Sequence, residues 1–290
     1  MSFQRRLSTG EFVILAEMHT PKGVDCTDML ANARRIKGRV DAITIPDMDN
    51  GVMKMSALAG GVLIQQQGIE AIIHVYCRDR NRMALQGDLL AAHALGIHNL
   101  VVVQGEEMSS GDHCAAKTVE DIDAIGLLEA VKSLQAGRDM AGLELKGAPD
   151  FIIGCGMARC ADDAAFEAEL ESLRKKVEAG AKFIVTPPVY NLEFSTPVIK
   201  KVAALGVPVI ASVFLIKSVG VARYIATNEP GAHISEDMIK RIRKAQDREM
   251  ECVRIAGEII AGLKGVAQGV QRVTLGWEHR LPAILDHAKL

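Results

Sequence analysis

The sequence has no long apolar run, although 49% of its 290 residues are hydrophobic. A membrane-spanning helix needs roughly 20 consecutive apolar residues, and no segment of this chain approaches that length. The first residues, MSFQRRLSTGEF, also lack the apolar core of a signal peptide. We therefore expect a cytoplasmic protein without a membrane span.

The sequence also lacks a charge excess of either sign. Its 34 basic and 36 acidic side chains give a formal net charge of −2. Binding to nucleic acid or to an acidic membrane depends on clustered positive charge. This balance gives no reason to expect either partner.

Closely paired cysteines, which bind metals in many proteins, are missing. Of the six cysteines only Cys155 and Cys160 lie near each other, in the stretch CGMARC. Zinc and iron–sulfur sites usually contain closer pairs of the C-x2-C type. We expect no metal site and interpret the cysteines as reduced thiols that pack as small buried side chains.

What the sequence does contain is a regular alternation of short, β-rich apolar runs with segments of helical periodicity. The expected strands are 12–17, 41–46, 71–77, 99–105, 151–156, 182–187, 207–215 and 269–275. The expected helices are 27–38, 53–68, 81–95, 119–137, 163–179, 195–205, 236–263 and 278–289. Gly68, Gly96, Gly180 and Gly206 stand where four of these helices should end.

The expected strands are continuously apolar, which is typical of a parallel sheet covered by helices. Eight strand–helix units in 290 residues favour a (β/α)8 TIM barrel. An open dinucleotide-binding sheet is disfavoured, because no G-x-G-x-x-G follows the first strand. No linker interrupts the pattern, so we expect one domain over residues 1–290. An extra helical stretch, 218–263, follows the seventh strand, and its long helix 236–263 either packs on the barrel or forms a subunit contact.

In such a barrel the active site lies at the carboxyl ends of the strands. The residues expected there are Glu17, His19, Asp47, Asp49, Cys77, Arg78, Gln104, Gly105, Glu106, Cys155, Thr186, Tyr190, Asn191 and Lys217, with His74 inside the third run. Glu17 stands out because it ends an apolar run, and an unpaired buried carboxylate costs several kcal/mol. Either Glu17 is solvated or ion-paired, or its acid chemistry is needed there. His74 is likewise either a core histidine or a ligand contact.

Four segments together carry a resemblance to a known family. They are AEMHTPKG, CRDRNRMALQGDLLAAHALGIHNLVVVQGE, KKVEAGAKFIVTPPVYN and GVPVIASVFLIKS. In this order they resemble the methylenetetrahydrofolate reductase family, and most closely its short, single-domain prokaryotic form. The resemblance runs from residue 12 to about residue 275. It implies a (β/α)8 barrel with a non-covalent flavin, FAD or alternatively FMN.

The resemblance also implies roles for individual residues. Glu17 matches the catalytic glutamate of the family, and the matches to flavin-contacting positions are His74, Gln104, Gly105, Asp121, Asp123, Lys175 and Lys176. Glu106, Thr186 and Tyr190 are implied on the folate side. A solvated helix end is the plain alternative for the two adjacent lysines.

Two departures from the family pattern concern the folate. The family usually has Thr-Gln where this chain has Thr186 and Pro187, and proline offers neither an amide side chain nor a backbone N–H. The family's Gly-Asp is Gly105-Glu106 here, which keeps the charge but moves it by one methylene. We therefore expect the flavin contacts to be kept and the folate contacts to differ.

The implied reaction is reduction of 5,10-methylenetetrahydrofolate to 5-methyltetrahydrofolate, with a hydride from flavin N5. Opening of the imidazolidine ring requires a proton at N10, and Glu17 is the implied general acid. A free glutamic acid is mostly ionised at neutral pH, but burial beside a flavin disfavours the charged form. A glutamate that ends an apolar strand is well placed for this role.

The implied electron donor is NADH or NADPH, or a partner subunit that carries iron–sulfur clusters. We also expect the chain to form an oligomer or to be a subunit of a complex. Two alternatives for the function are a folate-dependent methyltransferase and a flavin-carrying subunit of a larger one-carbon complex. A lyase or aldolase barrel would need a Schiff-base lysine within a strand, whereas Lys182 and Lys217 lie at strand margins.

Overall fold

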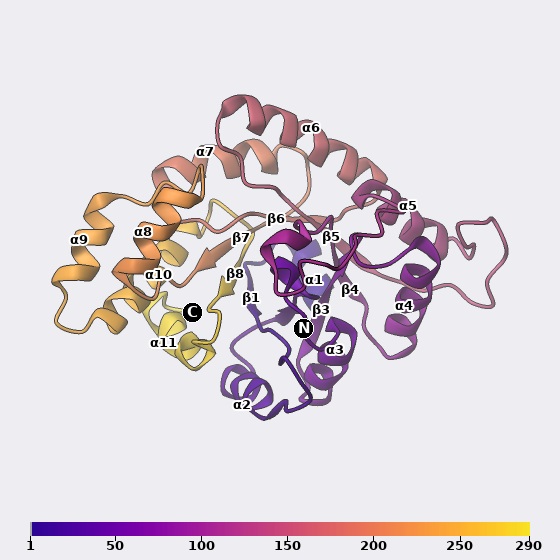
Figure 1. The fold of residues 1–290 in the computed structure, drawn as a ribbon, viewed down its shortest axis with the longest axis horizontal. Helices are drawn as coiled ribbons and strands as arrows, with labels where there is room; N and C mark the ends of the chain where they lie inside the picture. The colour runs from indigo at the N-terminus through magenta and orange to yellow at the C-terminus, as the bar shows by residue number, and fades with distance from the viewer. Residues whose placement is uncertain (1) are drawn as a thin grey trace.

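The structure is a computed structural model that describes residues 2–290, and it contains eight parallel strands closed into a barrel in chain order (Figure 1). The strands are β1 (Val13–Glu17), β2 (Ala42–Ile45), β3 (Glu70–Tyr76), β4 (Asn99–Val103), β5 (Ile152–Gly156), β6 (Phe183–Val185), β7 (Val209–Phe214) and β8 (Gly269–Val273). Closure is made by pairing of β1 with β8, in which Leu15 lies opposite Gln271. The predicted (β/α)8 fold is confirmed.

Helices surround the barrel on its outer face (Figure 1). They are α2 (Thr27–Ile36), α3 (Ala57–Gln66), α4 (Arg82–Ala94), α5 (Ala124–Gln135), α6 (Asp163–Ala179), α7 (Leu192–Ala203), α10 (Arg248–Leu263) and α11 (Leu281–His287). Side-chain caps fix several of their starts: Ser56, Asn81 and Asp123 each accept a hydrogen bond from a backbone N–H of the first turn. Three short 3-10 helices, η1 (Asp49–Gly51), η2 (Met108–Ser110) and η3 (Glu278–Arg280), follow β2, β4 and β8.

The predicted extra stretch after β7 consists of α8 (Val219–Asn228), α9 (Glu236–Lys244) and α10. The expectation of one helix over 236–263 is wrong, because the chain is extended at Ala245 and begins a new helix after Asp247. The Asp247 side chain accepts a hydrogen bond from Met250 N and so caps α10. A capped restart replaces the continuous helix that the apolar periodicity indicated.

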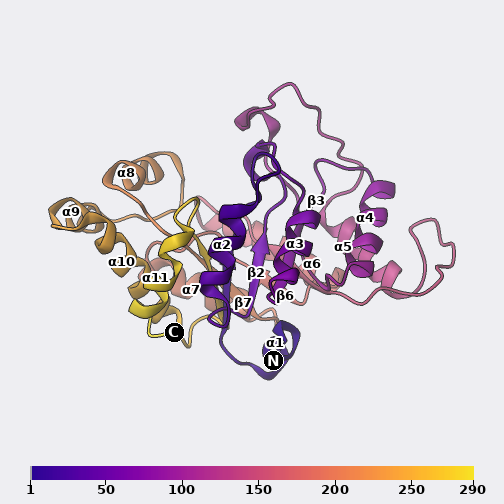
Figure 2. The same cartoon turned by 90° about the horizontal axis from the view of Figure 1, so that it is seen from below.

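A short N-terminal helix that the sequence pattern did not predict closes one end of the barrel. This helix, α1 (Phe3–Thr9), lies below the barrel in Figure 2, next to the amino ends of the strands. Phe3 is fully buried and packs edge-on against Phe183, with 5.5 Å between ring centroids. Phe3 and Leu7 join the inward-facing apolar side chains Val13, Leu15, Ala42, Ile72, Val101, Phe183, Val185 and Ile210.

The opposite end of the barrel carries the long segment 104–123 between β4 and α5, which lies above the strands in Figure 2. Its Gly111 packs against the backbone of Gly51 in η1 so closely that a Cβ on Gly111 would lie 2.0 Å from Gly51 O. Asp112 accepts a hydrogen bond from Met53 N and pairs with Lys22. Among the described residues, no helix is long and apolar enough to cross a membrane.

Candidate active site

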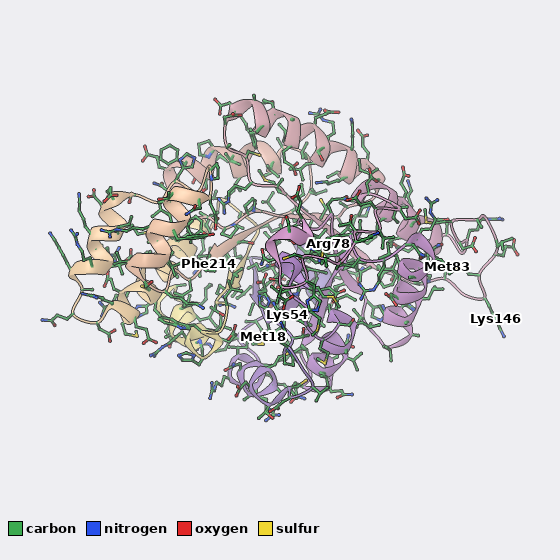
Figure 3. The ribbon with its side chains drawn as sticks, viewed as in Figure 1. Met18, Lys54, Arg78, Met83, Lys146 and Phe214 are labelled. Atoms are coloured by element: carbon green, nitrogen blue, oxygen red, sulfur yellow. The ribbon has the colours of Figure 1, made fainter. Side chains whose placement is uncertain are left out.

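A polar layer lies directly above the apolar layers of the barrel interior. Side chains alternate between the two faces of a strand, so the residues two positions beyond Leu15, Ala42, Ile72 and Ile210 also face inward. These are Glu17, Thr44, His74 and Ser212, and Gln271 of β8 completes the layer by bonding to Glu17. Lys54 and Arg78 lie over the middle of the ring of helices, whereas Met83 and Lys146 lie at the periphery (Figure 3). The carboxyl ends of the strands, here called the mouth, therefore form the polar end of the barrel, as predicted.

Glu17 is the last residue of β1, and its side chain is only 11% exposed. Gln271 Nε2 donates a hydrogen bond of 2.8 Å to Glu17 Oε2. His19 Nε2 lies 3.0 Å from Glu17 Oε1. The carboxyl group is thus held from both sides at the rim, which confirms the paired alternative for this residue.

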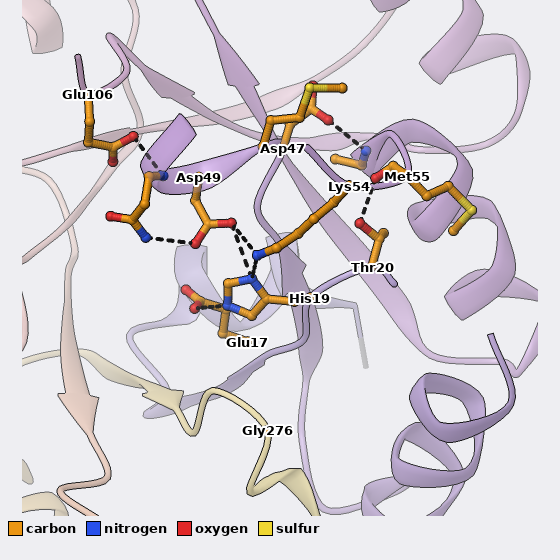
Figure 4. Close-up of polar contacts among 12 residues, drawn as sticks. Glu17, His19, Thr20, Asp47, Asp49, Lys54, Met55, Glu106 and Gly276 are labelled. Atoms are coloured by element: carbon orange, nitrogen blue, oxygen red, sulfur yellow. Dashed lines mark hydrogen bonds and ion pairs between the residues drawn. The ribbon is translucent and has the colours of Figure 1, made fainter. Parts of the chain in front are cut away.

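His19 joins Glu17 to a second acid and a base (Figure 4). His19 Nδ1 lies 3.2 Å from Asp49 Oδ1 and 2.7 Å from Lys54 Nζ, and Lys54 Nζ donates to Asp49 Oδ1 at 2.8 Å. Burial alone would lower the pKa of His19, but hydrogen bonds with Asp49 and Glu17 outweigh burial and raise the pKa to about 9. Burial would raise the pKa of Asp49, but its hydrogen bonds with His19 and Lys54 hold the pKa well below its usual range.

His74 faces the mouth from the middle of β3. Its Nε2 atom is buried and has no hydrogen-bond partner, and burial lowers the pKa of the ring. A buried polar atom without a partner is unusual, because its desolvation is not offset. Two strands further along the barrel, Gly156 ends β5 with open space where a side chain would project. The buried Nε2 lacks the partner that a bound group would supply, and Gly156 leaves space for such a group.

The turn after β4 contains three of the predicted site residues. Glu106 Oε2 accepts a hydrogen bond from Asn50 N at 3.1 Å, and Arg78 NH1 donates to the Glu106 carbonyl at 3.0 Å. Gly105 has a φ of 99°, and a Cβ there would lie 2.8 Å from Arg78 Cβ. Gln104 points away from this turn, because its Oε1 accepts a hydrogen bond from Ala124 N at the start of α5.

Of four further predicted cofactor residues, three make local structural contacts. Asp121 forms an ion pair with Arg82, 2.9 Å between Oδ2 and Nε, and Asp123 caps α5 by accepting from Gly126 N. Lys176 Nζ donates to Gly156 O and lies 3.3 Å from Glu169 Oε1, which places it beneath the end of β5. Lys175 is exposed on the same helix. The structure brings Lys176 to the barrel end and leaves Lys175 on the surface.

The two remaining predicted residues lie near the end of β6. Thr186 is buried, and its hydroxyl accepts from Ser212 N at 3.2 Å and contacts Pro187 O at 2.9 Å. Tyr190 is 3% exposed, and the Arg159 guanidinium lies 5.5 Å from the centre of its ring. Pro187 lines a cavity of about 420 Å³ at this edge of the mouth, together with Arg159, Pro188 and Phe194.

Cys155 and the two lysines considered for a Schiff base lie outside the polar layer. Cys155 is buried, and burial raises the pKa of its thiol to about 12, so it is not a reactive nucleophile. Within residues 2–290, no group of three or more His, Cys, Asp and Glu side chains is arranged to hold a metal ion. Lys182 is exposed and precedes β6, at the opposite end from the mouth. Lys217 donates to Leu275 O beyond β7.

Two residues of the site were not identified from the sequence. Gln271 interrupts the apolar run GVQRV, and a polar residue inside an expected strand was a usable signal. Lys54 lies in the connection between η1 and α3. Nothing in its spacing relates it to His19, since a loop has no fixed periodicity.

The overall architecture is similar to solved enzymes of different chemistry. A crystal structure of 2,3-dimethylmalate lyase, a member of the PEP mutase/isocitrate lyase superfamily, aligns with a TM-score of 0.57 and 11% identity, covering 99% of this chain and 83% of that one. EDTA monooxygenase (EmoA) from Chelativorans sp. BNC1 aligns with a TM-score of 0.55 and 10% identity, covering 97% and 95%. At such identities the likeness concerns the fold alone.

Sequence comparison is more specific. Methylenetetrahydrofolate reductase 2 of Schizosaccharomyces pombe is 22% identical over 251 residues, which cover 82% of this chain and 38% of that protein. The chain thus spans well under half the length of this relative. The profile of the methylenetetrahydrofolate reductase family matches residues 2–289. With nearly its whole length matched, the chain belongs to the methylenetetrahydrofolate reductase family, a family of oxidoreductases.

Proposed function

We propose that this protein reduces 5,10-methylenetetrahydrofolate to 5-methyltetrahydrofolate with a flavin bound at the mouth of the barrel, as one catalytic domain. The observation that carries the proposal is the buried Glu17 at the end of β1, held by Gln271 and His19. A carboxyl group with fixed partners and little exposure is what general acid catalysis at one defined atom requires.

The residues around the mouth fit a flavin. The unpartnered His74 Nε2 offers a hydrogen bond to a ring edge, and open space lies at Gly156 two strands away. Gly105, with its positive φ, keeps the turn after β4 free of a side chain. His74, Gly105 and Lys176 are the residues that would hold the group, and FAD is preferred over FMN on the family resemblance. When bound, the reduced flavin supplies the hydride.

The chain itself supplies orientation and one proton. Glu17 transfers a proton to N10 of the folate as the bond from N10 to the bridging carbon breaks, and the resulting carboxylate keeps its hydrogen bond from Gln271. Glu106, fixed by Asn50 N, presents its second carboxylate oxygen to donor groups of the pterin. Tyr190 and Thr186 lie beside the folate on the β6 side, where Pro187 replaces the amide side chain of the family.

The electrons come from NADH or NADPH, or from an iron–sulfur partner subunit. A methyltransferase needs no bound flavin, so the colour of the purified protein separates the two functions. Flavin identity follows from the absorbance and mass of the released cofactor. Bleaching by NADH alone would exclude an obligatory partner subunit.

The proposal is tested with Glu17→Gln. We expect the variant to keep its flavin spectrum and to reduce the folate about 10²–10⁴-fold more slowly, because the acid is lost while its shape remains. Glu144→Gln is the matched control, since that side chain is 82% exposed and lies in a loop outside the barrel. Near-normal turnover of Glu17→Gln, or a colourless protein that does not bind FAD or FMN, would contradict the proposal.

A further inference from the structure

The His19 side chain bridges two parts of the mouth with different access to solvent. Its Nε2 contacts Glu17, whose carboxyl group faces the barrel interior, and its Nδ1 contacts Lys54 (Figure 4). His19 and Lys54 also line a cavity of about 920 Å³ beside β1, together with Met18, Arg35 and Gly276. The imidazole therefore connects the interior carboxyl group to a space outside the barrel.

His19 and Lys54 belong to one hydrogen-bonded cluster, with 2.7 Å between His19 Nδ1 and Lys54 Nζ. Asp49 Oδ1 accepts from both groups, at 2.8 and 3.2 Å, and holds them together. Two carboxylates face the imidazole, and their hydrogen bonds raise the pKa of His19 to about 9. The cluster therefore keeps a proton on the imidazole at neutral pH, next to Glu17.

The proposed reaction consumes one proton from Glu17 in each turnover. An isolated glutamate is mostly ionised at neutral pH, and the interior side of this carboxyl group is covered by Gln271. A proton can reach Glu17 by two routes: directly from solvent, or from the neighbouring imidazole of His19, which lies within hydrogen-bond distance at 3.0 Å. Short, preformed hydrogen bonds favour the second route.

We propose that His19 reprotonates Glu17, while Asp49 and Lys54 hold the imidazole and connect it to the outer cavity. The inference rests on the proposed function of Glu17. In the step, the His19 Nε2–H bond breaks and a Glu17 Oε1–H bond forms. The imidazole is left neutral and recovers its proton from water in the cavity. His19 acts through Glu17 and is a positioning and proton-supplying residue that does not touch the folate.

The pH dependence follows from the groups that surround His19. Those in contact are Glu17 from β1, Asp49 from η1 and Lys54 from the loop before α3. Charged or titratable groups on the adjoining elements are His74, Asp25, Asp28, Arg35, Glu278 and His279. His19 is protonated below its pKa of about 9, so the rate of folate reduction should fall as pH rises through that value.

The kinetic test compares wild type with His19→Gln in continuous turnover of the folate with excess dithionite as electron donor, and in a separate single reoxidation of the reduced flavin by menadione. Flavin reoxidation by 5,10-methylenetetrahydrofolate requires the proton, whereas reoxidation by menadione does not use Glu17. We expect the folate step to slow at least about 10-fold in the variant and to lose its fall near pH 9, with the menadione step unchanged. His98→Gln, an exposed histidine before β4, is the control and should match wild type.

A second measurement needs no cofactor. Protein labelled with ¹³C-histidine reports the titration of each ring by NMR, and the His19 signal is identified by its loss in His19→Gln. The midpoint should lie near pH 9 in wild type and fall in Glu17→Gln and in Asp49→Asn. A wild-type midpoint near the ordinary value of about 6.5 would overturn the proposed role of His19. If His19→Gln fails to fold, the His19 signal is identified instead by the change of its midpoint in Glu17→Gln and in Asp49→Asn.

The outcomes separate the two proposals. If wild type does not pass electrons to the folate at all, the proposed function is wrong, and the proposed role of His19 is wrong as well. If wild type reduces the folate, and His19→Gln keeps both the full rate and the decrease of that rate near pH 9, only the proposed role of His19 is wrong.

Discussion

The two ends of the barrel use the same alternation of side chains for opposite purposes. At the amino ends, inward positions are apolar and α1 covers them with Phe3 and Leu7. Two residues further along the strands, the inward positions hold Glu17, Thr44 and His74. The covered end is filled by apolar side chains, whereas the open end holds paired charges and the unsatisfied Nε2 of His74. Stability and chemistry are thus separated along the barrel axis, a division typical of this fold.

The largest expected effect on stability is at the closed end. Phe3→Ala removes a fully buried ring from its contact with Phe183, and we expect a loss of about 3–5 kcal/mol in the free energy of unfolding. Urea unfolding followed by circular dichroism measures it. Phe194→Ala, at 51% exposed, is the control and should change stability far less. A similar loss for both variants would mean that α1 does not close the barrel.

At the open end, stability should depend on pH through His19. Its folded-state pKa of about 9 lies above the unfolded value of about 6.5. The stabilisation is therefore complete below pH 6.5 and is lost as pH rises through about 9, on the order of 3 kcal/mol in total. Urea midpoints of wild type and His19→Gln, measured from pH 6 to 10, should converge at the alkaline end. Parallel curves would contradict this linkage.

The segment over the open end should respond to a single added methyl group. Gly111→Ala places a Cβ against Gly51 O, so the backbone must shift, at a cost of about 1–2 kcal/mol. We expect faster hydrogen exchange and proteolysis within residues 104–123. Gly87→Ala in α4 meets no atom within 4 Å and is the control. Alanine is favoured there, because it has the higher helix propensity. Equal protection of 104–123 in both variants would show that the glycine contact does not hold the segment.

The smallest effect is expected for a surface ion pair away from the mouth. Arg138 NH2 lies 3.5 Å from Glu144 Oε1, and both side chains are more than half exposed. Glu144→Gln should change the free energy of unfolding by less than about 0.5 kcal/mol, because solvent screens such pairs. The urea midpoint measures it. A loss comparable to that of Phe3→Ala would mean that this loop contributes to the core.

The sequence predicted elements better than it predicted contacts. All eight strands and the position of Glu17 at the end of β1 follow from runs of apolar residues. Helix α1 was missed because FQRRLST has only Phe3 and Leu7 as apolar positions, too few to show a periodicity. The break at Ala245 was missed because apolar spacing continues on both sides of it. Local patterns of apolar residues indicate which face of a helix is buried, but they do not indicate where one helix ends and the next begins.

For the site residues, too, the sequence predicted positions better than contacts. Position at a strand end predicted Glu17, His19 and Asp49, because parallel strands bring their carboxyl ends together. It did not predict that Asp121 pairs with Arg82, or that Gln104 bonds to the start of α5. Side-chain partners depend on rotamers and loop paths, which no periodicity encodes.

The order of apolar runs and helical segments was sufficient to determine the barrel, because burial of strands on both faces and amphipathic helices leave few other ways to exclude water. Only the tertiary structure determined which groups meet at its mouth. Glu17 and Gln271 are separated by 254 positions and become neighbours because β1 and β8 close the barrel. Lys54 reaches His19 from a loop, and the hydrogen bonds and charges of the folded chain set the protonation of that histidine.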